Sequence, residues 1–508
     1  MLILELLYFL STALLAVYGL NTLLHAWLYW RERSRTPPPA PPGAQIFSPA
    51  NNGQPEAAWY PMVTVQLPIY NERHVVTRLI EAVLKLDWPA NRLQIQVLDD
   101  STDDTRQITA AALARHTHLG VQLAHLRRPD RQGFKAGALQ YGLASATGEF
   151  IAIFDADFIP PADFLKQTIP CFTDATVGCV QTRWGHVNPN TSRLTKAQAL
   201  GIDGHFIVEQ HVRHTIGAFL NFNGTAGVWR RTAMIDAGGW QGDTLTEDLD
   251  LSYRAQLRGW RIAYLANVVV PAELPVQIDA FKRQQFRWAK GSLQTAIKLL
   301  RPLWRAPQPG WLKLMAALHL TNYAVHPLMV LNLLLILPMT FSHSWVLQLA
   351  PFFTLTAVGP PLMYWTAMKA QAIPWPARLR RLATLMALGT GLSVNNTWAA
   401  IEAIGHIQSE FKRTPKFAVT GQQTHWQTSS YALPRDPTAW LESGLALYAL
   451  GLLAYSLAAG IWWMVFWLLL YAGGYSYIAY LAFAQAWQMR AARSALIAAR
   501  PSDGQPLI

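Results

Sequence analysis

The sequence predicts an α/β domain inserted into an α-helical transmembrane bundle, and three observations support this fold class. Between about residues 60 and 270, short apolar runs alternate with segments of helical length, as in a mainly parallel sheet covered by helices. Uncharged stretches long enough to cross a bilayer lie on both sides of that region. Hydrophobic residues make up 51% of the 508 residues and charged residues only 14%, about half the share of a typical soluble domain.

The first segment, residues 1–30, contains one acidic residue, Glu5, and no Lys or Arg. It is long enough to span a membrane, and the arginines that follow from Arg31 place the next residues in the cytoplasm. A cleaved signal peptide is the competing interpretation, but the apolar stretch is too long and has no basic start. We therefore predict an N-terminal transmembrane helix with its N-terminus outside, followed by a Pro-rich linker at residues 31–58.

Residues 59–275 form the predicted α/β domain. Strands are expected at Val63–Leu67, Gln94–Leu98, Val121–Leu126 and Phe150–Phe154, and helices are expected to begin near Arg73, Asp103 and Phe134. Open α/β sheets bind ligands beyond the carboxyl ends of their strands. Polar residues collect at these ends, as in Pro68–Glu72 after the first strand and Asp99–Ser101 after the second.

Asp155 and Asp157 follow the fourth predicted strand directly. Two carboxylates one residue apart at this position suit Mg²⁺ or Mn²⁺ bound to a diphosphate, because both ions prefer oxygen ligands. A solvated turn is the alternative for an isolated Asp-x-Asp motif. The residues around the motif favour the metal site.

Four further residues, together with the aspartate pair, have the chemistry that sugar transfer from a nucleotide donor requires. Lys135 and Arg287 can place positive charge on the phosphates, and Asp248 can take the proton of an acceptor hydroxyl. Trp288 can stack against a sugar ring. Each has an ordinary alternative, since Asp248 can belong to a helix start, Lys135 to a solvated helix and Trp288 to a membrane interface. Their occurrence together and in this order favours the catalytic interpretation.

The chain after the α/β domain is predicted to be mainly membrane-associated. Residues 276–310 mix cations with Trp, Phe and Leu, as helices in a membrane interface do. Residues 311–369 contain two uncharged stretches, 314–341 and 345–368, each able to cross once. Residues 436–489 can supply two more crossings, with a turn near Gly460.

Residues 382–401 are uncharged and long enough to cross, but they are rich in Gly, Thr, Ser and Asn. If they do not cross, the basic residues of 369–381, 412–416 and the tail at 490–508 all face the cytoplasm, as the positive-inside tendency favours. We predict an interfacial or re-entrant helix within residues 370–408, and five crossings in total.

The sequence resembles the processive family-2 glycosyltransferases of the cellulose synthase superfamily, from about Pro61 to Phe417. The signature elements are Asp99 in Val-Leu-Asp-Asp-Ser, Asp155 with Asp157, Thr246-Glu247-Asp248, and Gln284-x-x-Arg287-Trp288. The segments Gln181–His186 and Phe222–Gly227 are most similar to the plant cellulose-synthase-like mannan and glucan synthases and their bacterial relatives.

The resemblance implies a cytoplasmic GT-A (Rossmann-like) domain and inverting transfer from an α-linked nucleotide sugar to a β-linked chain. It places Pro68, Tyr70, Glu72, Asp99, Lys135, Asp155 and Arg287 at the donor, Asp155 and Asp157 at a divalent cation, and Asp248 as the base. It places Phe222, Asn223, Gly224, Thr225, Glu247, Gln284 and Trp288 at the acceptor.

A gating loop at residues 409–420, with Phe411, Thr414 and Lys416, is also implied, although by itself this stretch is typical of a basic loop that binds lipid head groups. Bacterial cellulose synthases carry Phe-x-Cys-Gly-Ser where this chain has Asn223 and Thr225 in place of Cys and Ser. This difference leaves the identity of the sugar open.

We therefore expect an enzyme of the bacterial inner (plasma) membrane that makes a β-1,4-linked glucan, mannan or glucomannan from UDP-glucose or GDP-mannose and translocates the growing chain. The alternatives are a non-processive transferase that adds one sugar to a lipid, and a transporter with a degenerate nucleotide domain.

The net charge of +12 does not indicate nucleic-acid binding, because Lys and Arg form no basic tail. Cys171 and Cys179 match no zinc or redox spacing and are expected to be packing residues of a reduced compartment.

Overall fold

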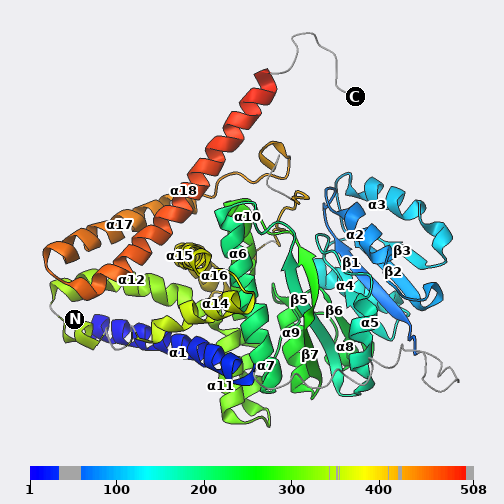
Figure 1. The fold of residues 1–508 in the computed structure, drawn as a ribbon, viewed down its shortest axis with the longest axis horizontal. Helices are drawn as coiled ribbons and strands as arrows, with labels where there is room; N and C mark the ends of the chain where they lie inside the picture. The colour runs from blue at the N-terminus through cyan, green and yellow to red at the C-terminus, as the bar shows by residue number, and fades with distance from the viewer. Residues whose placement is uncertain are drawn as a thin grey trace.

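The computed structural model describes residues 1–33, 59–342, 344–349, 353, 355–409, 411–420 and 426–498. Most of the predicted linker and the last ten residues of the predicted tail, 499–508, lie outside this part of the chain. The described residues form an α/β unit joined to a set of long helices, as the sequence predicts (Figure 1).

The α/β unit is built on a seven-stranded sheet with the order β3-β2-β1-β4-β6-β5-β7. The strands are β1 (Val63–Ile69), β2 (Leu93–Asp99), β3 (Gln122–Leu126), β4 (Phe150–Ile153), β5 (Val177–His186), β6 (Gly227–Arg230) and β7 (Arg261–Ala272). Neighbouring strands are parallel except that β6 runs antiparallel to both β4 and β5. The four predicted strands are confirmed with small shifts at their ends.

Both faces of the sheet are covered, which explains why β1, β2 and β4 are buried along almost their whole length. One face packs against α2 (Val76–Leu84), α3 (Thr105–Ala114) and α5 (Phe164–Thr168). The other packs against α4 (Phe134–Ser145), α8 (Arg231–Asp236) and α9 (Glu247–Leu257). Since β1, β2 and β4 are parallel neighbours, the segments that follow them open at one edge of the sheet.

Beyond β5, the chain forms a helix that stands between the sheet and the long apolar helices (Figure 1). It consists of α6 (Arg193–Asp203), the π-helical segment η5 (Gly204–Gln210) and α7 (His211–Thr215). Buried side chains of η5 and α7 form one apolar cluster with α1 (Leu2–Glu32) and α14 (Gly359–Ala370). After β7 comes α10 (Ile278–Arg305), the long helix predicted to be amphipathic.

Four helical segments in the described residues are long and apolar enough to cross a membrane. They are Leu2–Glu32 (α1), Asn322–Phe341 (mostly α12, Val325–Phe341), Thr438–Ala458 (α17) and Trp462–Ala498 (α18). These segments correspond to four of the five predicted crossings. A short helix, α11 (Gly310–Leu320), precedes the second of them.

The remaining predicted crossing, residues 345–368, is not one continuous helix where it is described. It contains short 3₁₀ turns at Trp345–Leu349 and Leu355–Val358 before α14 begins. Two prolines at the start of α14 fit this interruption, because proline suits the first turn of a helix and disturbs the hydrogen bonds of a helix that continues through it. That this stretch crosses the membrane stays a prediction.

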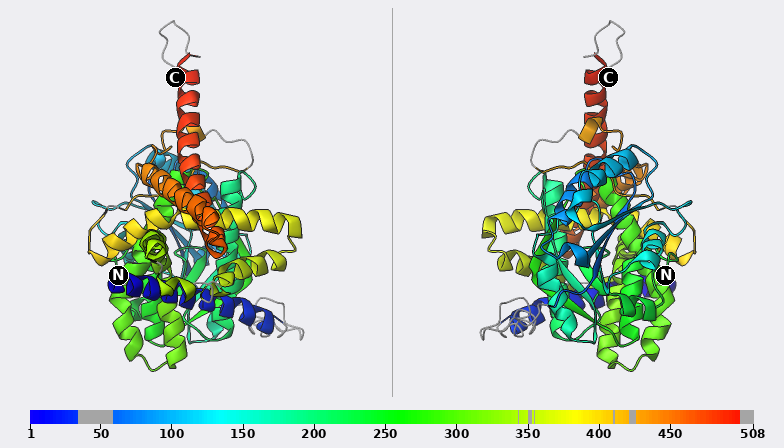
Figure 2. Two further views of the ribbon diagram at one scale, coloured as in Figure 1. Left: turned by 90° about the vertical axis from the view of Figure 1, so that its left-hand side faces the viewer. Right: turned by 90° about the vertical axis from the view of Figure 1, so that its right-hand side faces the viewer.

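Residues 382–401 lie in two helices, α15 (Trp375–Gly391) and α16 (Ser393–Ile404). Figure 1 shows α15 end-on while α12 and α17 run along the page, and Figure 2 shows α15 extending sideways from the bundle. A Cβ at Gly391 would lie 2.4 Å from the carbonyl oxygen of Gly474, so glycine allows α15 to meet α18 closely. The crossing direction fits a helix that does not span, but its position in a membrane stays a prediction.

A buried ion pair ties α10 to the apolar helix α17. Lys282 Nζ lies 2.6 Å from Glu442 Oε1 and donates to Thr438 Oγ1 at 2.5 Å. The Lys282 and Glu442 side chains are only 1% and 0% exposed. Removing one partner of such a pair leaves an uncompensated buried charge, which typically costs about 3 to 5 kcal/mol.

We therefore expect Lys282→Met to lower the stability of the folded protein strongly, and Lys282→Met/Glu442→Leu to recover much of the loss. Thermal unfolding in one detergent measures both effects. The control is Asp243→Asn, which removes an exposed partner of Lys298 and should cost less than about 1 kcal/mol. Equal losses for Lys282→Met and the control would show that the buried pair does not hold α10 in place.

Candidate active site

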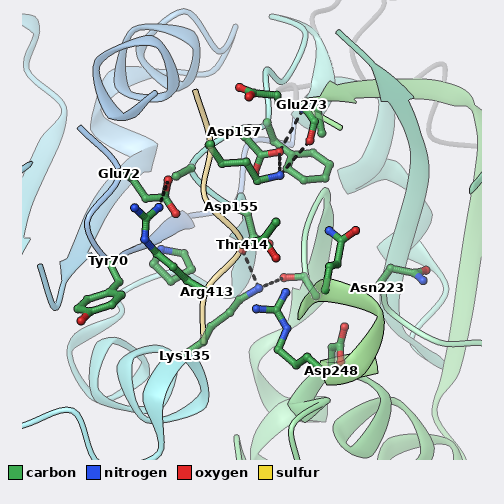
Figure 3. A pocket seen from close by; sticks show the side chains of 18 of the residues that line it. Tyr70, Glu72, Lys135, Asp155, Asp157, Asn223, Asp248, Glu273, Arg413 and Thr414 are labelled. Atoms are coloured by element: carbon green, nitrogen blue, oxygen red, sulfur yellow. Dashed lines mark hydrogen bonds and ion pairs between the residues drawn. The ribbon is translucent and has the colours of Figure 1, made fainter. Parts of the chain in front are cut away.

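A cavity opens at the edge where β1, β2 and β4 end, and most of the predicted site residues line it (Figure 3). The donor-side residues that line it are Pro68, Tyr70, Glu72, Lys135, Asp155, Asp157 and Arg287. The acceptor-side residues are Asn223, Gly224, Glu247, Gln284 and Trp288, together with Asp248. Phe411, Thr414 and Lys416 of the predicted gating loop line it as well.

Lys135 stands between the Asp155 carboxylate and the loop before β6. Its Nζ lies 2.6 Å from Asp155 Oδ1 and donates to the Gly224 carbonyl at 3.0 Å. The lysine lies in the first turn of α4, which begins after Gly133 with a positive φ of 69°. Burial lowers the pKa of Lys135, but the charges of Asp155 and Glu247 outweigh it, so the pKa is raised and the amine is charged.

Asp248 and Glu247 begin α9 and face the same lysine. Burial and the neighbouring charge of Glu247 raise the pKa of Asp248 to about 7, against the opposing charge of Lys135. A carboxyl group with a pKa near neutrality is suited to general-base catalysis. Gly224 has a φ of +81°, and a Cβ there would lie 2.8 Å from Asp248 Oδ2, so only glycine leaves the carboxylate open to the cavity.

The segment 411–416 lies over the cavity and is tied down by two cations. Lys416 Nζ lies 2.7 Å from Asp157 Oδ2 and donates to the Glu273 carbonyl at 2.9 Å. Arg413 lies 3.2 Å from Glu72 Oε2. Burial raises the pKa of Glu72 to about 8, more than the charge of Arg413 lowers it.

Aromatic contacts complete the closure over the cavity. The Phe411 ring stacks on Phe134, with ring centroids 5.5 Å apart, and the Arg287 guanidinium lies 4.6 Å from the Phe411 ring. Arg287 belongs to α10, like Trp288, whose ring centroid lies 6.4 Å from that of Trp184. These contacts place the signature residues of α10 directly beneath the predicted gating loop.

Three predicted site residues do not line the cavity. Asp99, expected at the nucleotide, is buried and bound to His125 Nε2 at 2.9 Å and to the Ser101 N–H at 2.9 Å. Phe222 is fully buried against Trp229, and the Thr225 hydroxyl accepts from the Asp155 N–H at 2.8 Å. All three support the walls of the cavity, and their expected contacts with the donor or acceptor stay a prediction.

The structure also adds residues that the sequence did not single out. The cavity is lined by Asp100, Arg131, Trp184, His186, Glu273 and Arg413. Asp100 pairs with Arg128, and the Arg131 guanidinium covers the Tyr70 ring at 3.3 Å. The sequence could have indicated two of these residues, because Asp100 follows Asp99 directly and Arg413 lies three residues before Lys416.

Asp155 and Asp157 have the chemistry of a divalent-cation site. Their carboxylates are hard oxygen ligands of the kind that Mg²⁺ and Mn²⁺ prefer. No cluster of three or more His, Cys, Asp or Glu side chains suited to a metal occurs in the part of the chain that is described. An ion held by this pair would therefore take further ligands from a phosphate or from water, as Mg²⁺ commonly does.

Together, the sheet order and the acidic edge define a GT-A-type α/β domain attached to membrane-type helices. Residues 61–291 match the family model "Glycosyltransferase like family 2". These residues are a family-2 glycosyltransferase domain.

Two similar curated proteins come from one plant. Glucomannan 4-beta-mannosyltransferase 1 of Oryza sativa subsp. japonica is 44% identical over 251 residues, 48% of this chain and 48% of the relative. The probable glucomannan 4-beta-mannosyltransferase 7 of the same plant is 37% identical over 368 residues, 68% of this chain and 62% of the relative. The chain spans about half the length of the first of these relatives.

Among solved structures, a mannosyltransferase from Pyrobaculum calidifontis in complex with GDP-Man and Mn²⁺ is similar with a TM-score of 0.49 and 22% identity. The similarity covers 80% of this chain and all of that chain.

Proposed function

We propose that the protein is a membrane-embedded, inverting glycosyltransferase that polymerises a β-1,4-linked mannan, glucan or glucomannan from GDP-mannose or UDP-glucose. The observation that carries this proposal is the placement of Asp248, with a pKa of about 7, in one cavity with Lys135, Asp155 and Arg287. This arrangement offers a base on one side and an acidic, metal-type site with cations on the other. The names of the plant relatives favour mannosyl transfer.

The proposed reaction is one in-line displacement. Ionised Asp248 takes the proton of the acceptor hydroxyl as its oxygen bonds to the anomeric carbon of the donor. The bond from that carbon to the phosphate oxygen breaks with inversion, and the electron pair leaves with the nucleoside diphosphate. Lys135 and Arg287 stabilise the negative charge that develops there.

The proposal assigns further binding roles to residues around the cavity. Asp155 and Asp157 would hold Mg²⁺ or Mn²⁺, which would neutralise the diphosphate. Trp288, on α10, would support the acceptor sugar, and the segment 411–416 would close over the donor. Polymer growth at this membrane-facing edge, with export through the protein's own helices, is part of the proposal.

The test uses purified protein in sealed proteoliposomes with outward-facing catalytic domains. Radiolabelled GDP-mannose and UDP-glucose are added separately and together, with and without Mg²⁺ or Mn²⁺. The expected product is a metal-dependent polymer that is protected inside the lumen and, after detergent is added, becomes sensitive to an endo-β-1,4-mannanase or glucanase. An organic-soluble product with one sugar would support the lipid-transferase alternative, and absence of any transfer or donor hydrolysis would support the transporter.

The proposed location is the inner membrane of a bacterium, with the catalytic domain and the C-terminus in the cytoplasm. We expect a cysteine introduced at Lys412, an exposed position of the same loop, to be labelled only from the cytoplasmic side, and one at the exposed Ser342 only from outside. Cys171 and Cys179 are both buried, so they give a low background for impermeant maleimides. Outside labelling at position 412 would show that residues 382–401 cross the membrane and would contradict this topology.

A further inference from the structure

The π-helical segment η5 lies between the catalytic cavity and the membrane-type helices. Such π-helical turns are rare and occur frequently at functional sites, since the extra residue in the turn disturbs regular hydrogen bonding. Ile207 and Val208 of η5 are buried in a cluster with residues of α1 and α14, such as Ala26 and Met363. Three polar residues of the same turn, His205, Glu209 and Gln210, connect instead to the loop before β6.

Gln210 fixes the orientation of the Asn223 amide. Its Nε2 donates to the Asn221 carbonyl at 2.8 Å and to Asn223 Oδ1 at 2.9 Å. Because a carbonyl oxygen can only accept, the nitrogen of the Gln210 amide must face Asn221. Gln210 is fully buried, so its amide cannot turn toward water. Its hydrogen bond to Asn223 Oδ1 therefore keeps that oxygen facing Gln210 and leaves Asn223 Nδ2 facing away from it.

His205 receives that nitrogen. Asn223 Nδ2 donates to His205 Nε2 at 3.1 Å, so Nε2 must carry the lone pair. The ring proton is then on Nδ1, which donates to Glu209 Oε2 at 2.9 Å. Burial raises the pKa of Glu209, but the hydrogen bond from His205 and the charge of Arg213 lower it below its usual range, so the carboxylate is ionised. The direction of every hydrogen bond in this series is therefore fixed, because the Asn221 carbonyl at one end and the Glu209 carboxylate at the other can only accept.

Asn223 itself lines the catalytic cavity beside Gly224 and Asp248. Its backbone N–H donates to Gln181 Oε1 at 2.8 Å, which holds the loop in place. Among the described residues, His205 is the partner of only one of the two Nδ2 hydrogens. The second hydrogen is left for a ligand in the cavity, which Asn223 and Asp248 both line.

We propose that His205 and Gln210 are positioning residues that orient the Asn223 amide, so that Asn223 donates a hydrogen bond to a hydroxyl oxygen of the acceptor sugar beside Asp248. The inference rests on the proposed function, since it needs a sugar acceptor. It assigns acceptor recognition to a turn that also packs on two membrane-type helices. Sequence similarity alone points to Asn223 but to none of the residues that set its polarity.

The test measures transfer to a soluble β-1,4-linked oligosaccharide acceptor over a range of acceptor concentrations. His205→Leu should raise the acceptor KM about tenfold, because the Asn223 amide loses the partner that orients it. Its kcat, its donor KM and its rate of donor hydrolysis should stay within about twofold of wild type. His205→Gln, whose side-chain oxygen can accept from Asn223, should recover much of the acceptor affinity. The control is His214→Leu, a histidine of α7 that does not line the cavity.

A double-mutant cycle separates positioning from a general structural effect. Asn223→Ala should raise the acceptor KM as His205→Leu does, and the double variant should be no worse than Asn223→Ala alone. If His205→Leu does not fold, Gln210→Leu combined with Asn223→Ala provides the same cycle. Provided that the wild-type protein transfers sugar, two results would overturn the inference alone. One is additive effects of the two substitutions, and the other is an acceptor KM that His205→Leu leaves unchanged. A wild-type protein that transfers no sugar would overturn the proposed function, and the inference with it.

Discussion

Asp248→Asn is expected to abolish sugar transfer while leaving donor binding within a few-fold of normal. The substitution keeps the shape of the side chain, and the amide oxygen can still accept the Leu249 N–H that Asp248 Oδ1 accepts at 2.8 Å. It removes the group that takes the acceptor proton, so the loss should appear in kcat. Removal of a general base typically costs on the order of 10²- to 10⁴-fold in rate.

The measurements are transfer under saturating donor and the dissociation constant of the nucleotide diphosphate. Asp243→Asn, at an exposed position just before α9, is the control and should transfer at the normal rate. Asp157→Ala should show the opposite pattern to Asp248→Asn, with weaker metal-dependent donor binding. If Asp248→Asn kept half of the wild-type rate, another group would have to be the base.

Lys135→Met should give the second largest loss, on the order of 10²-fold at neutral pH, because one charge serves two purposes. The Lys135 amine contacts Asp155, where the donor phosphates are proposed to bind, and its charge also lowers the pKa of Asp248. Without it, the pKa of Asp248 rises above about 7, and a smaller fraction is ionised at any pH below the new value. Since the ionised form is the base, the acidic limb of the transfer profile should move to higher pH.

A pH series of kcat/KM for the wild type and Lys135→Met measures this shift. The wild-type rate should fall on acidification below about pH 7, following the pKa of Asp248. Lys166→Met is the control, because Lys166 pairs with Asp87 on the surface, away from the cavity. A variant with a reduced rate but an unmoved acidic limb would show that Lys135 acts on the phosphates only.

Much of the sheet could be predicted because its central strands are short apolar runs with polar residues at their ends. Val63–Leu67 and Gln94–Leu98 lie in buried strands that pair in parallel, as the alternation of strands and helices predicts. The antiparallel insertion of β6 between β4 and β5 could not be predicted, because it depends on contacts between distant segments. The break between α15 and α16 could not be predicted either, because composition shows that residues 382–401 are polar but not where a helix ends within them.

The candidate site shows the same division between residue type and spatial arrangement. Signature spacing identified Asp155, Asp248 and Arg287, which all line the cavity. Spacing could not show that Asp99 turns into the sheet and pairs with His125, because that depends on strand β3 lying beside β2. The role inferred for His205 depends on the π-helical turn, whose register no periodicity in the sequence reveals.

If Asp157 holds the donor's metal as proposed, its ion pair with Lys416 competes with donor binding. The ammonium group lies 2.7 Å from the carboxylate oxygen that a metal–diphosphate complex would need, so loading requires the lysine to leave first. The apparent dissociation constant is then the intrinsic constant divided by the fraction of molecules in which this contact is open. Weakening that contact would then lower the apparent dissociation constant of the donor without altering the chemistry of transfer.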